Sequence, residues 1–351
     1  MTRERTPFER DILEQPAALE RAAARPPASL HQLTSTPWER VVITGMGSSF
    51  QAGLPTWMEL TARGLPAWAI DTGQLLDTPG LITRSTLLIV TSQSGESAEV
   101  VDLLKRRGHA GFTPQLLVGV VDDLNSTLAS SSDVVLPLHS GSEATVSTKS
   151  YLNTLAVHRY IMGAFSGEDA SAASGAIQDA ASAVKVLLER PPGWDPAVLR
   201  NLAAHALDTA RPRLATIGWS TQAATALYAA LIIKEGAKLG AEGFVGGQFR
   251  HGPFELAGGG LTAVVFSRSG GPPEQGLHRL TTDLRRTGST VAIVGGTAPP
   301  ATIFLPTPGN SLLETTVTGA VVAQLLTVQF ALANKVTPGA FAFGTKVTRL
   351  L

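Results

Sequence analysis

The sequence predicts an α/β protein made of two parallel sheets, each flanked by helices in a three-layer αβα arrangement. Apolar runs of about four to six residues, such as 41–44 and 116–121, alternate with helical patterns, as is typical of strands buried on both faces. The second half of the chain repeats the pattern of the first. Gly makes up 35 of the 351 residues and aromatic residues only 6%, which suits many tight turns between strands and helices.

The first half is predicted to contain five strands. They are expected at residues 41–44, 67–70, 86–91, 116–121 and 134–138. One helix is expected to begin near Phe50, and another to cover 96–107. Before the first strand, residues 8–26 form a helical pattern that Pro16 interrupts and Pro26 ends, because proline is excluded from a helix interior.

The duplication is visible in matched segments. Residues 88–95 (LIVTSQSG) correspond to residues 263–270 (AVVFSRSG), and Gly45 corresponds to Gly218. The period of about 170 residues is far too long for a solenoid, so it indicates two domains. We predict a helical segment at 1–38, a first domain at 39–166, a connecting helical segment at 167–210, a second domain at 211–333 and a tail at 334–351.

Composition excludes several classes of function. With 28 basic and 28 acidic side chains, the net charge is zero, which gives no footprint for nucleic acid or an anionic membrane. The chain contains no cysteine, which excludes disulfides, thiolate nucleophiles, zinc–thiolate sites and iron–sulfur clusters. No apolar run reaches the roughly 18–20 residues of a membrane span, and the charged start does not read as a signal peptide. We therefore expect a cytoplasmic protein without metal or cofactor.

The most informative stretch is residues 91–97, Thr-Ser-Gln-Ser-Gly-Glu-Ser, between an apolar run and a helical pattern that starts at Ala98. Unpaired backbone N–H groups and the helix dipole favour an anion at a helix start. The three serines and Thr91 add neutral donors, which suits a small sugar phosphate better than a nucleotide with magnesium. In the second copy, residues 271–273 (Gly-Pro-Pro) stand in place of Glu96 and Ser97. We therefore predict that the first copy binds the phosphate.

The motifs in combination resemble the sugar isomerase (SIS) family of phosphosugar-binding proteins, in its tandem two-domain form. That form is found in the isomerase half of glucosamine-6-phosphate synthase and in amino-sugar-6-phosphate deaminases. The motifs follow one order over nearly the whole chain: 11–16 (DILEQP), 47–49 (GSS), 92–97 (SQSGES), 147–149 (STK), 234–235 (KE), 247–253 (GQFRHGP) and 346–348 (KVT). The resemblance implies two tandem SIS domains, a phosphosugar ligand and a C-terminal tail docked on the site.

Three residues are candidates for catalysis. Glu235 lies near the end of the otherwise apolar helical segment 224–238, where partial desolvation raises the pKa of a carboxyl toward that of a general base. Such a residue alone is more often a solvated helix end, but by resemblance Glu235 moves a proton between C1 and C2 of the open-chain sugar. His251, on a Gly-Pro turn, resembles the ring-opening histidine of the family. Lys346 resembles the lysine that closes over the sugar and that forms a Schiff base in the synthase.

The predicted binding residues come from three loops, which by resemblance contact the sugar hydroxyls and the phosphate. They are Gly47, Ser48, Ser49, Ser92, Gln93, Ser94, Ser97, Thr145 and Ser147. The resemblance further implies a homodimer in which His251 serves the pocket of the neighbouring subunit.

The chain departs from the synthase pattern at four charged positions. Tyr228 and Ile232 replace a Glu and a Lys, Gln248 stands where the family has Glu, and Ala342 replaces an Arg. We expect these changes to make the pocket less polar, and to affect the choice of substrate more than the proton transfer. Tyr228 either supplies a phenolic donor or fills the core.

Two functions remain open. The first is an aldose–ketose isomerase or deaminase that acts on an amino-sugar 6-phosphate or an N-substituted fructose 6-phosphate. Since the chain has no cysteine nucleophile, we do not expect it to use glutamine. The alternative is a non-catalytic protein that binds a sugar phosphate. A dinucleotide site is not expected, because Phe50 stands where the fingerprint of that site needs a glycine.

Overall fold

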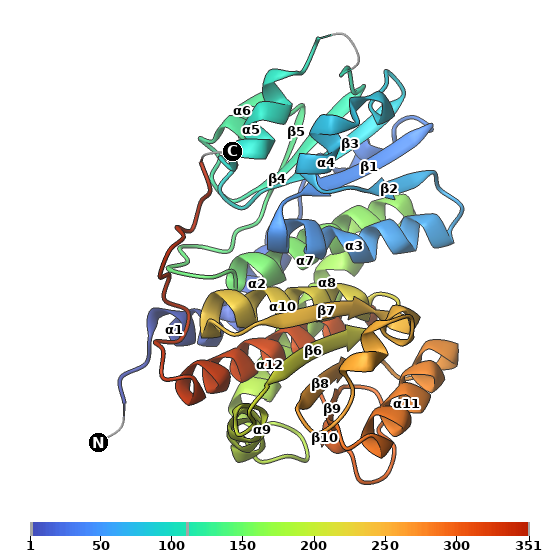
Figure 1. Cartoon of the computed structure of the whole chain (residues 1–351). Helices are drawn as coiled ribbons and strands as arrows, with labels where there is room; N and C mark the ends of the chain where they lie inside the picture. The colour runs from blue at the N-terminus through green and yellow to red at the C-terminus, as the bar shows by residue number, and fades with distance from the viewer. Residues whose placement is uncertain (1–2, 110–111, 350–351) are drawn as a thin grey trace. The chain divides into compact units, whose positions relative to one another are not determined.

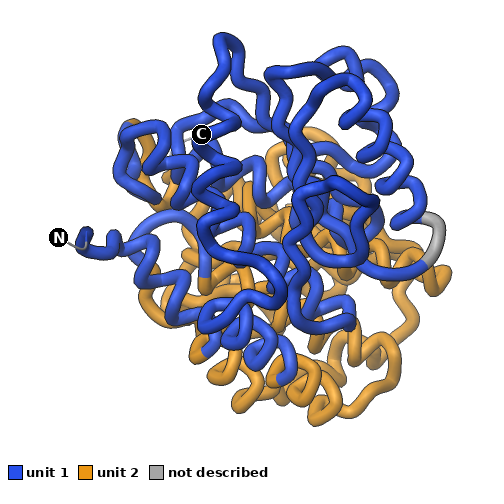
Figure 2. Tube along the Cα trace, turned by 90° about the horizontal axis from the view of Figure 1, so that it is seen from below, with its two compact units in different colours: residues 1–16, 144–148, 179–342 blue, residues 17–143, 149–178, 343–351 orange. Residues whose placement is uncertain are grey.

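The computed structural model describes residues 3–109 and 112–349, and the chain divides into two compact units (Figure 2). Unit 1 comprises Met1–Pro16, Ala144–Thr148 and Asp179–Ala342, and unit 2 comprises Ala17–Glu143, Lys149–Gln178 and Phe343–Leu351. Each unit is therefore assembled from separate parts of the chain. The first residues belong to the unit that holds the second sheet, and the last residues belong to the unit that holds the first sheet.

The sheet of unit 2 has five parallel strands in the order β2-β1-β3-β4-β5 (Figure 1). The strands are β1 (Arg40–Gly45), β2 (Ala67–Ala69), β3 (Thr86–Thr91), β4 (Leu116–Val121) and β5 (Val134–Pro137). The helices are α2 (Gln15–Ala23), which begins in unit 1, η1 (Leu30–Thr34), α3 (Gly47–Ala62), α4 (Thr72–Asp77), η2 (Pro79–Leu81), α5 (Ala98–Lys105), α6 (Thr127–Ser131), α7 (Lys149–Phe165) and α8 (Ala170–Glu189), which continues into unit 1. Every residue of β3 is buried, as expected for a central strand that is covered on both faces.

The sheet of unit 1 also has five parallel strands, in the order β10-β9-β8-β6-β7. The strands are β6 (Arg213–Gly218), β7 (Ala241–Val245), β8 (Leu261–Phe266), β9 (Thr290–Val294) and β10 (Ile303–Leu305). The helices are α1 (Pro7–Leu13), α9 (Ala197–Leu207), α10 (Gln222–Ala237), η3 (Gly246–Arg250), η4 (Pro253–Leu256), α11 (Gly271–Arg286) and α12 (Leu312–Ala333). When β6 is matched to β1, the two strand orders are the same, which agrees with the predicted duplication.

Both sheets change their direction of growth at one place. In unit 2 the chain adds β2 on one side of β1 and then β3 on the other. In unit 1 it does the same with β7 and β8 around β6. Ligands of open parallel sheets bind outside the carboxyl ends of the strands at such a reversal. The segments that follow β1 and β3 are therefore the first place to look for a site.

Helix α12 forms much of the core of unit 1 and packs along α10. A capping box between Ser311 and Glu314 fixes its start. It has 22 residues, and within 3–109 and 112–349 it is the one helix that is long and apolar enough to cross a membrane. Since 78% of its apolar window is buried inside the protein, its composition is that of a core helix.

The predicted strands of the first half lie close to the observed ones, but two details of the prediction are wrong. Pro16 does not interrupt a helix, because it is the second residue of α2 and the break falls at Glu14. At a helix start the missing N–H of proline removes no hydrogen bond. Helix α3 begins at Gly47, before Phe50, and Gly47 has a φ of +51°.

Candidate active site

In unit 2, the predicted phosphate loop joins β3 to α5. Ser92 is buried, and its Oγ lies 3.3 Å from the Oγ of Ser97 and accepts a 3.2 Å hydrogen bond from the N–H of Gly95. Gly95 has a φ of +66°, and a Cβ there would lie 2.1 Å from the Oγ of Ser126. Only glycine fits this turn, which keeps the Ser92 and Ser97 hydroxyls together at the start of α5.

Glu96, the acidic residue of this loop, is hydrogen-bonded to the start of α6. One carboxylate oxygen of Glu96 accepts a 2.5 Å hydrogen bond from the N–H of Thr127, and the other accepts a 3.1 Å bond from the hydroxyl of Thr127. Thr127 is the first residue of α6, and a helix start stabilises a negative charge. The charge of Glu96 is thus engaged at α6, while the other polar side chains of the loop are neutral.

A second loop follows β1 at the same edge of the sheet. Gly45 pairs with Thr91 in the sheet, and a Cβ on Gly45 would lie 2.8 Å from the carbonyl oxygen of Thr91. Ser48 and Ser49, in the first turn of α3, are half-buried. Because β1 and β3 are adjacent and parallel, residues 47–49 and 92–97 leave the same edge of the sheet at its reversal point.

The C-terminal tail reaches this part of unit 2. The carbonyl of Thr348 accepts a 2.9 Å hydrogen bond from the N–H of Ala98, the first residue of α5. The ammonium of Lys346 lies 2.9 Å from Oε2 of Glu143, whose side chain is fully buried. Glu143 also accepts hydrogen bonds from the N–H of Ser150, at 3.0 Å, and from its hydroxyl, at 2.6 Å. Burial acts to raise the pKa of Glu143, but the Lys346 ammonium and the Ser150 donors hold this pKa below its usual value.

In unit 1, Glu235 lies in the last turn of α10 and is half-buried. Burial raises the pKa of Glu235, while the nearby Lys238 and Lys234 ammonium groups act to lower it, and the net direction is upward. The direction agrees with the reasoning from the apolar helix. Lys238 caps the helix in a left-handed conformation, and its Nζ donates to the carbonyl of Glu235.

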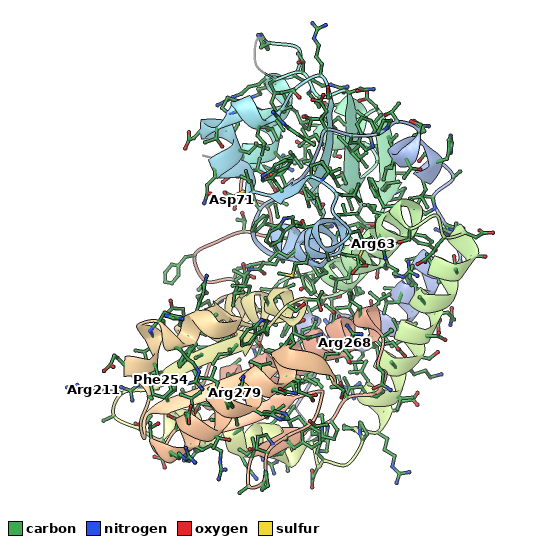
Figure 3. All side chains as sticks on the ribbon, turned by 90° about the vertical axis from the view of Figure 1, so that its right-hand side faces the viewer. Arg63, Asp71, Arg211, Phe254, Arg268 and Arg279 are labelled. Carbon is green, nitrogen blue, oxygen red and sulfur yellow. The ribbon has the colours of Figure 1, made fainter. Side chains whose placement is uncertain are left out.

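His251 is an exposed residue at the end of η3 in unit 1. Its N–H donates a 2.9 Å hydrogen bond to the carbonyl of Gln248. Gly252, with a φ of +108°, turns the chain immediately after it. The neighbouring Phe249 is buried, and its ring packs edge-on against the ring of Phe254 (Figure 3), with 6.4 Å between the ring centroids. This aromatic packing fixes the turn on which His251 lies.

The third predicted loop, residues 144–148, belongs to unit 1. Thr145 and Ser147 are half-buried. The carbonyl of Ser147 accepts a 2.7 Å hydrogen bond from the hydroxyl of Tyr228. The structure therefore answers the question left open by the sequence, since Tyr228 is fully buried and also donates from its phenol.

The predicted site residues thus divide between the units. Unit 2 contains Gly47, Ser48, Ser49, Ser92, Gln93, Ser94, Ser97 and Lys346. Unit 1 contains Thr145, Ser147, Glu235 and His251. The expectation that all four altered positions make a pocket less polar is wrong for two of them, because Tyr228 and Ile232 have no exposed surface. Gln248 and Ala342 are exposed.

Sequence reasoning missed Glu143 as the partner of Lys346. The two residues are 203 positions apart, and no local pattern connects positions so distant. The one local sign in the sequence is that Glu143 precedes a segment rich in Ser and Thr, whose hydroxyls can donate to a buried carboxylate. Among residues 3–109 and 112–349, no group of three or more His, Asp or Glu side chains could hold a metal ion.

In unit 1, the loop that corresponds to the predicted phosphate loop follows β8, and a glutamate side chain is hydrogen-bonded to it. The carboxylate of Glu274 accepts hydrogen bonds from the N–H of Gly270 at 2.8 Å, and from the N–H and hydroxyl of Thr297 at 2.9 and 2.7 Å. Arg268, labelled in Figure 3, lies in the same loop and is exposed. Since an internal carboxylate already occupies these donors, a phosphate would meet a negative charge there. The two copies therefore differ at the loop itself, since Glu274 accepts from the loop N–H of Gly270 whereas Glu96 accepts from Thr127. That the first copy binds the phosphate stays a prediction.

Comparison with known proteins agrees with this architecture. Residues 36–178 match the SIS domain. Two curated relatives are glutamine–fructose-6-phosphate aminotransferases (isomerizing), from Pyrococcus horikoshii and from Caulobacter vibrioides. The first is 28% identical over 81% of this chain and 47% of its own length, and the second is 26% identical over 93% of this chain and 56% of its own length. The chain thus spans about half the length of the curated relatives it matches.

Solved structures share the fold over almost the whole chain. The C-terminal domain of glucosamine-fructose-6-phosphate aminotransferase from Francisella tularensis superposes with a TM-score of 0.83 and 17% identity, covering 96% of this chain and 98% of that one. Tagatose-6-phosphate ketose/aldose isomerase from Escherichia coli gives a TM-score of 0.79 and 21% identity, covering 96% of both chains. Glucosamine-6-phosphate deaminase from Thermotoga maritima gives 0.75 and 20%, covering 97% of this chain and 99% of that one. The domain match thus identifies residues 36–178 as an SIS domain, and the solved structures show the same two-sheet fold over almost the whole chain.

Proposed function

We propose that the chain is a phosphosugar aldose–ketose isomerase or deaminase that acts on an amino-sugar 6-phosphate or an N-substituted fructose 6-phosphate. The observation that carries the proposal is Glu235, a half-buried carboxylate whose pKa is raised by burial at the end of an apolar helix. A carboxyl with a raised pKa is a stronger base than a solvated one and can accept a proton and return it. The relatives include an aminotransferase, a deaminase and a ketose/aldose isomerase, and their names support the proposed class of substrate.

The phosphate is assigned to the loops of unit 2. Ser92 and Ser97 supply neutral hydroxyls at the start of α5, and the charge of Glu96 is engaged at α6. A helix start with neutral donors stabilises a phosphate without adding a competing negative charge. The proposed contacts from these loops are Gly47, Ser48, Ser49, Ser92, Gln93, Ser94 and Ser97. Thr145 and Ser147, which belong to unit 1, are proposed to contact the sugar as well.

Proton transfer is assigned to unit 1. In the proposed reaction His251 moves a proton between the ring oxygen and the hydroxyl on C1, which opens the sugar. Glu235 then removes the proton from C2 of the aldose, the C–H electron pair forms the C1=C2 double bond, and the C1 oxygen takes up a proton to give a 1,2-enol. The same carboxyl returns its proton to C1, while the oxygen or nitrogen on C2 loses a proton, so the proton count balances. With a 2-amino sugar the product is an imine, and water attacks it and releases ammonia to leave the ketose.

Lys346 is proposed to act as a cation. An ammonium that is paired with a buried carboxylate at 2.9 Å has no lone pair to attack a carbonyl, so the Schiff base known from the synthase requires this pair to open first. A homodimer in which His251 serves the neighbouring subunit, and a cytoplasmic location, complete the proposal and rest on the family resemblance.

The test is turnover of glucosamine 6-phosphate, with fructose 6-phosphate and ammonia assayed together. The Glu235→Gln variant is expected to lower kcat by about 10²–10⁴-fold while phosphosugar binding stays nearly unchanged. Glu242→Gln is the matched control, since Glu242 is an exposed glutamate of the same unit. Absence of turnover with both glucosamine 6-phosphate and N-substituted fructose 6-phosphates contradicts the proposal.

The alternative is a non-catalytic sugar-phosphate-binding protein, and the Lys346–Glu143 pair favours it because that pair occupies the proposed lysine. This alternative predicts thermal stabilisation by the ligand without product. At a ligand concentration of roughly 100 times Kd, the stabilisation is about 2.7 kcal/mol. Detection of fructose 6-phosphate under these conditions excludes the alternative.

A further inference from the structure

The segment 144–148 of unit 1, which carries Thr145 and Ser147, is held at three points. The N–H of Ala144 donates a 3.0 Å hydrogen bond to the carboxylate of Asp11. Val146 is buried in a cluster with Phe8, Ile12 and Val328. The carbonyl of Ser147 receives the Tyr228 hydroxyl at 2.7 Å. The segment is therefore fixed on α1, α12 and α10, all within unit 1.

Tyr228 is itself oriented by a buried amide pair. The side chains of Gln15 and Gln324 donate to each other, with N···O distances of 2.7 and 3.0 Å, and both are fully buried. Gln324 also donates to the Tyr228 oxygen at 2.8 Å. Since a phenol carries one proton, and its oxygen is here the acceptor of the Gln324 amide, that proton is directed to the Ser147 carbonyl. Gln15 is in turn fixed through a 3.0 Å hydrogen bond to the carbonyl of Ile12.

We infer that Tyr228 is a positioning residue for the sugar-binding segment 144–148, acting through the Ser147 carbonyl. The inference rests on the proposed function, because it assigns Tyr228 a task in substrate binding. A carboxylate at position 228, as in the synthase pattern, has no proton to donate to a carbonyl at neutral pH. Tyr228 therefore supplies a hydrogen-bond donor that a glutamate at this position lacks, and it donates to the Ser147 carbonyl inside the core.

The role predicts a specific kinetic signature. Tyr228→Phe removes one buried hydrogen bond and leaves the ring in place. Loss of one such bond corresponds to an equilibrium shift of about three- to tenfold. Because the affected segment is proposed to contact the sugar in the ground state and in the transition state alike, KM is expected to rise by about that factor while kcat changes by less than about twofold.

The matched control is Tyr160→Phe. Tyr160 is also a fully buried tyrosine, and its hydroxyl donates to the backbone carbonyl of Ala22 at 3.1 Å, in unit 2. Tyr160→Phe thus removes a buried hydroxyl that donates to a backbone carbonyl, together with its 2.8 Å contact to the Ser174 hydroxyl, in the unit that does not contain 144–148. It is expected to lower the melting temperature as much as Tyr228→Phe does and to leave KM unchanged.

A second measurement does not depend on the ligand. Hydrogen exchange of the amides at 145–148 is expected to be about three- to tenfold faster in Tyr228→Phe than in the wild type, and unchanged in Tyr160→Phe. Equal exchange in the wild type and Tyr228→Phe overturns the positioning role. Faster exchange with an unchanged KM for a phosphosugar that the wild type converts overturns its connection to binding.

The two proposals fail in different ways. If the wild type neither binds nor converts a phosphosugar, the proposed function is wrong and the assigned task of Tyr228 in binding falls with it, whatever the exchange rates are. If the wild type converts the sugar and Tyr228→Phe has wild-type KM and exchange rates, the proposed function stands and the inference about Tyr228 is wrong.

Discussion

His158 gives the structure a pH dependence that can be worked out in advance. It lies on α7 in unit 2 and is almost completely buried. Its Nδ1 lies 2.9 Å from the hydroxyl of Thr56, and its Nε2 lies 3.3 Å from the hydroxyl of Thr91, the last residue of β3. Burial lowers the pKa of His158 from 6.5 to about 4. The folded protein therefore keeps the imidazole neutral beneath the phosphate loop.

The direction and size of the effect follow from linkage. The unfolded chain binds the imidazole proton with a pKa of 6.5, whereas the folded chain binds it only near pH 4. Because the unfolded state binds the proton more readily, stability is complete above pH 6.5 and is lost as the pH falls toward 4. A pKa difference of about 2.5 corresponds to about 3 kcal/mol in full, of which about 2 kcal/mol is lost between about pH 7 and pH 5.

Hydrogen exchange of the slowest amides in β3 and α7 at pH 5 and pH 7, corrected for the intrinsic rates, measures this loss in unit 2. His158→Gln is expected to be less stable at pH 7 but to lose about 2 kcal/mol less than the wild type on acidification. The comparison removes the contribution of His139, whose pKa is lowered by burial and by Arg25. His31→Gln, at an exposed position, is the control. An unchanged pH dependence in His158→Gln, or an imidazole that titrates near pH 6.5 by NMR, refutes the reasoning.

Two further substitutions test the predicted phosphate loop and the C-terminal tail. Gly95→Ala is expected to lower the free energy of unfolding by about 3 kcal/mol or more, because the new Cβ would clash with Ser126. Gly64→Ala is the control, since Gly64 also has a positive φ, of +80°, but no atom of the described residues lies near its Cβ position, and its expected loss is only about 1 kcal/mol. Equal losses for the two variants in melting experiments contradict the steric explanation. Glu143→Gln removes the charge that holds Lys346, so trypsin cleavage after Lys346 is expected to be about tenfold faster, and wild-type cleavage rates show that the ion pair does not hold the tail.

The strands of the first half were predictable because their signal is local. Residues 86–91 and 116–121 are short, β-branched and apolar, and both match β3 and β4 at each end. Length and composition suffice to separate such runs from the helices between them. The duplication was equally readable, since matched loops after matched strands require no knowledge of the packing.

The parts that could not be predicted depend on contacts between distant residues. The sequence places Glu96 in the phosphate loop, but only the fold brings Thr127 to its carboxylate. The pairing of Gln15 with Gln324 spans 309 positions, and periodicity carries no information over that distance. Tyr228 was ambiguous for the same reason, because a buried tyrosine and one that lines a pocket have the same local pattern.

The exchange of chain ends between the units has a consequence for synthesis. The sheet of unit 2 is complete once residue 137 has been made, yet Glu143 and Ala98 bind Lys346 and Thr348. During synthesis, domains fold from the N-terminus onward. The contacts of Glu143 and Ala98 with the tail can therefore form only after the whole second sheet has been translated. Until Lys346 has been made, Glu143 lacks the ammonium that helps to hold its pKa below the usual value.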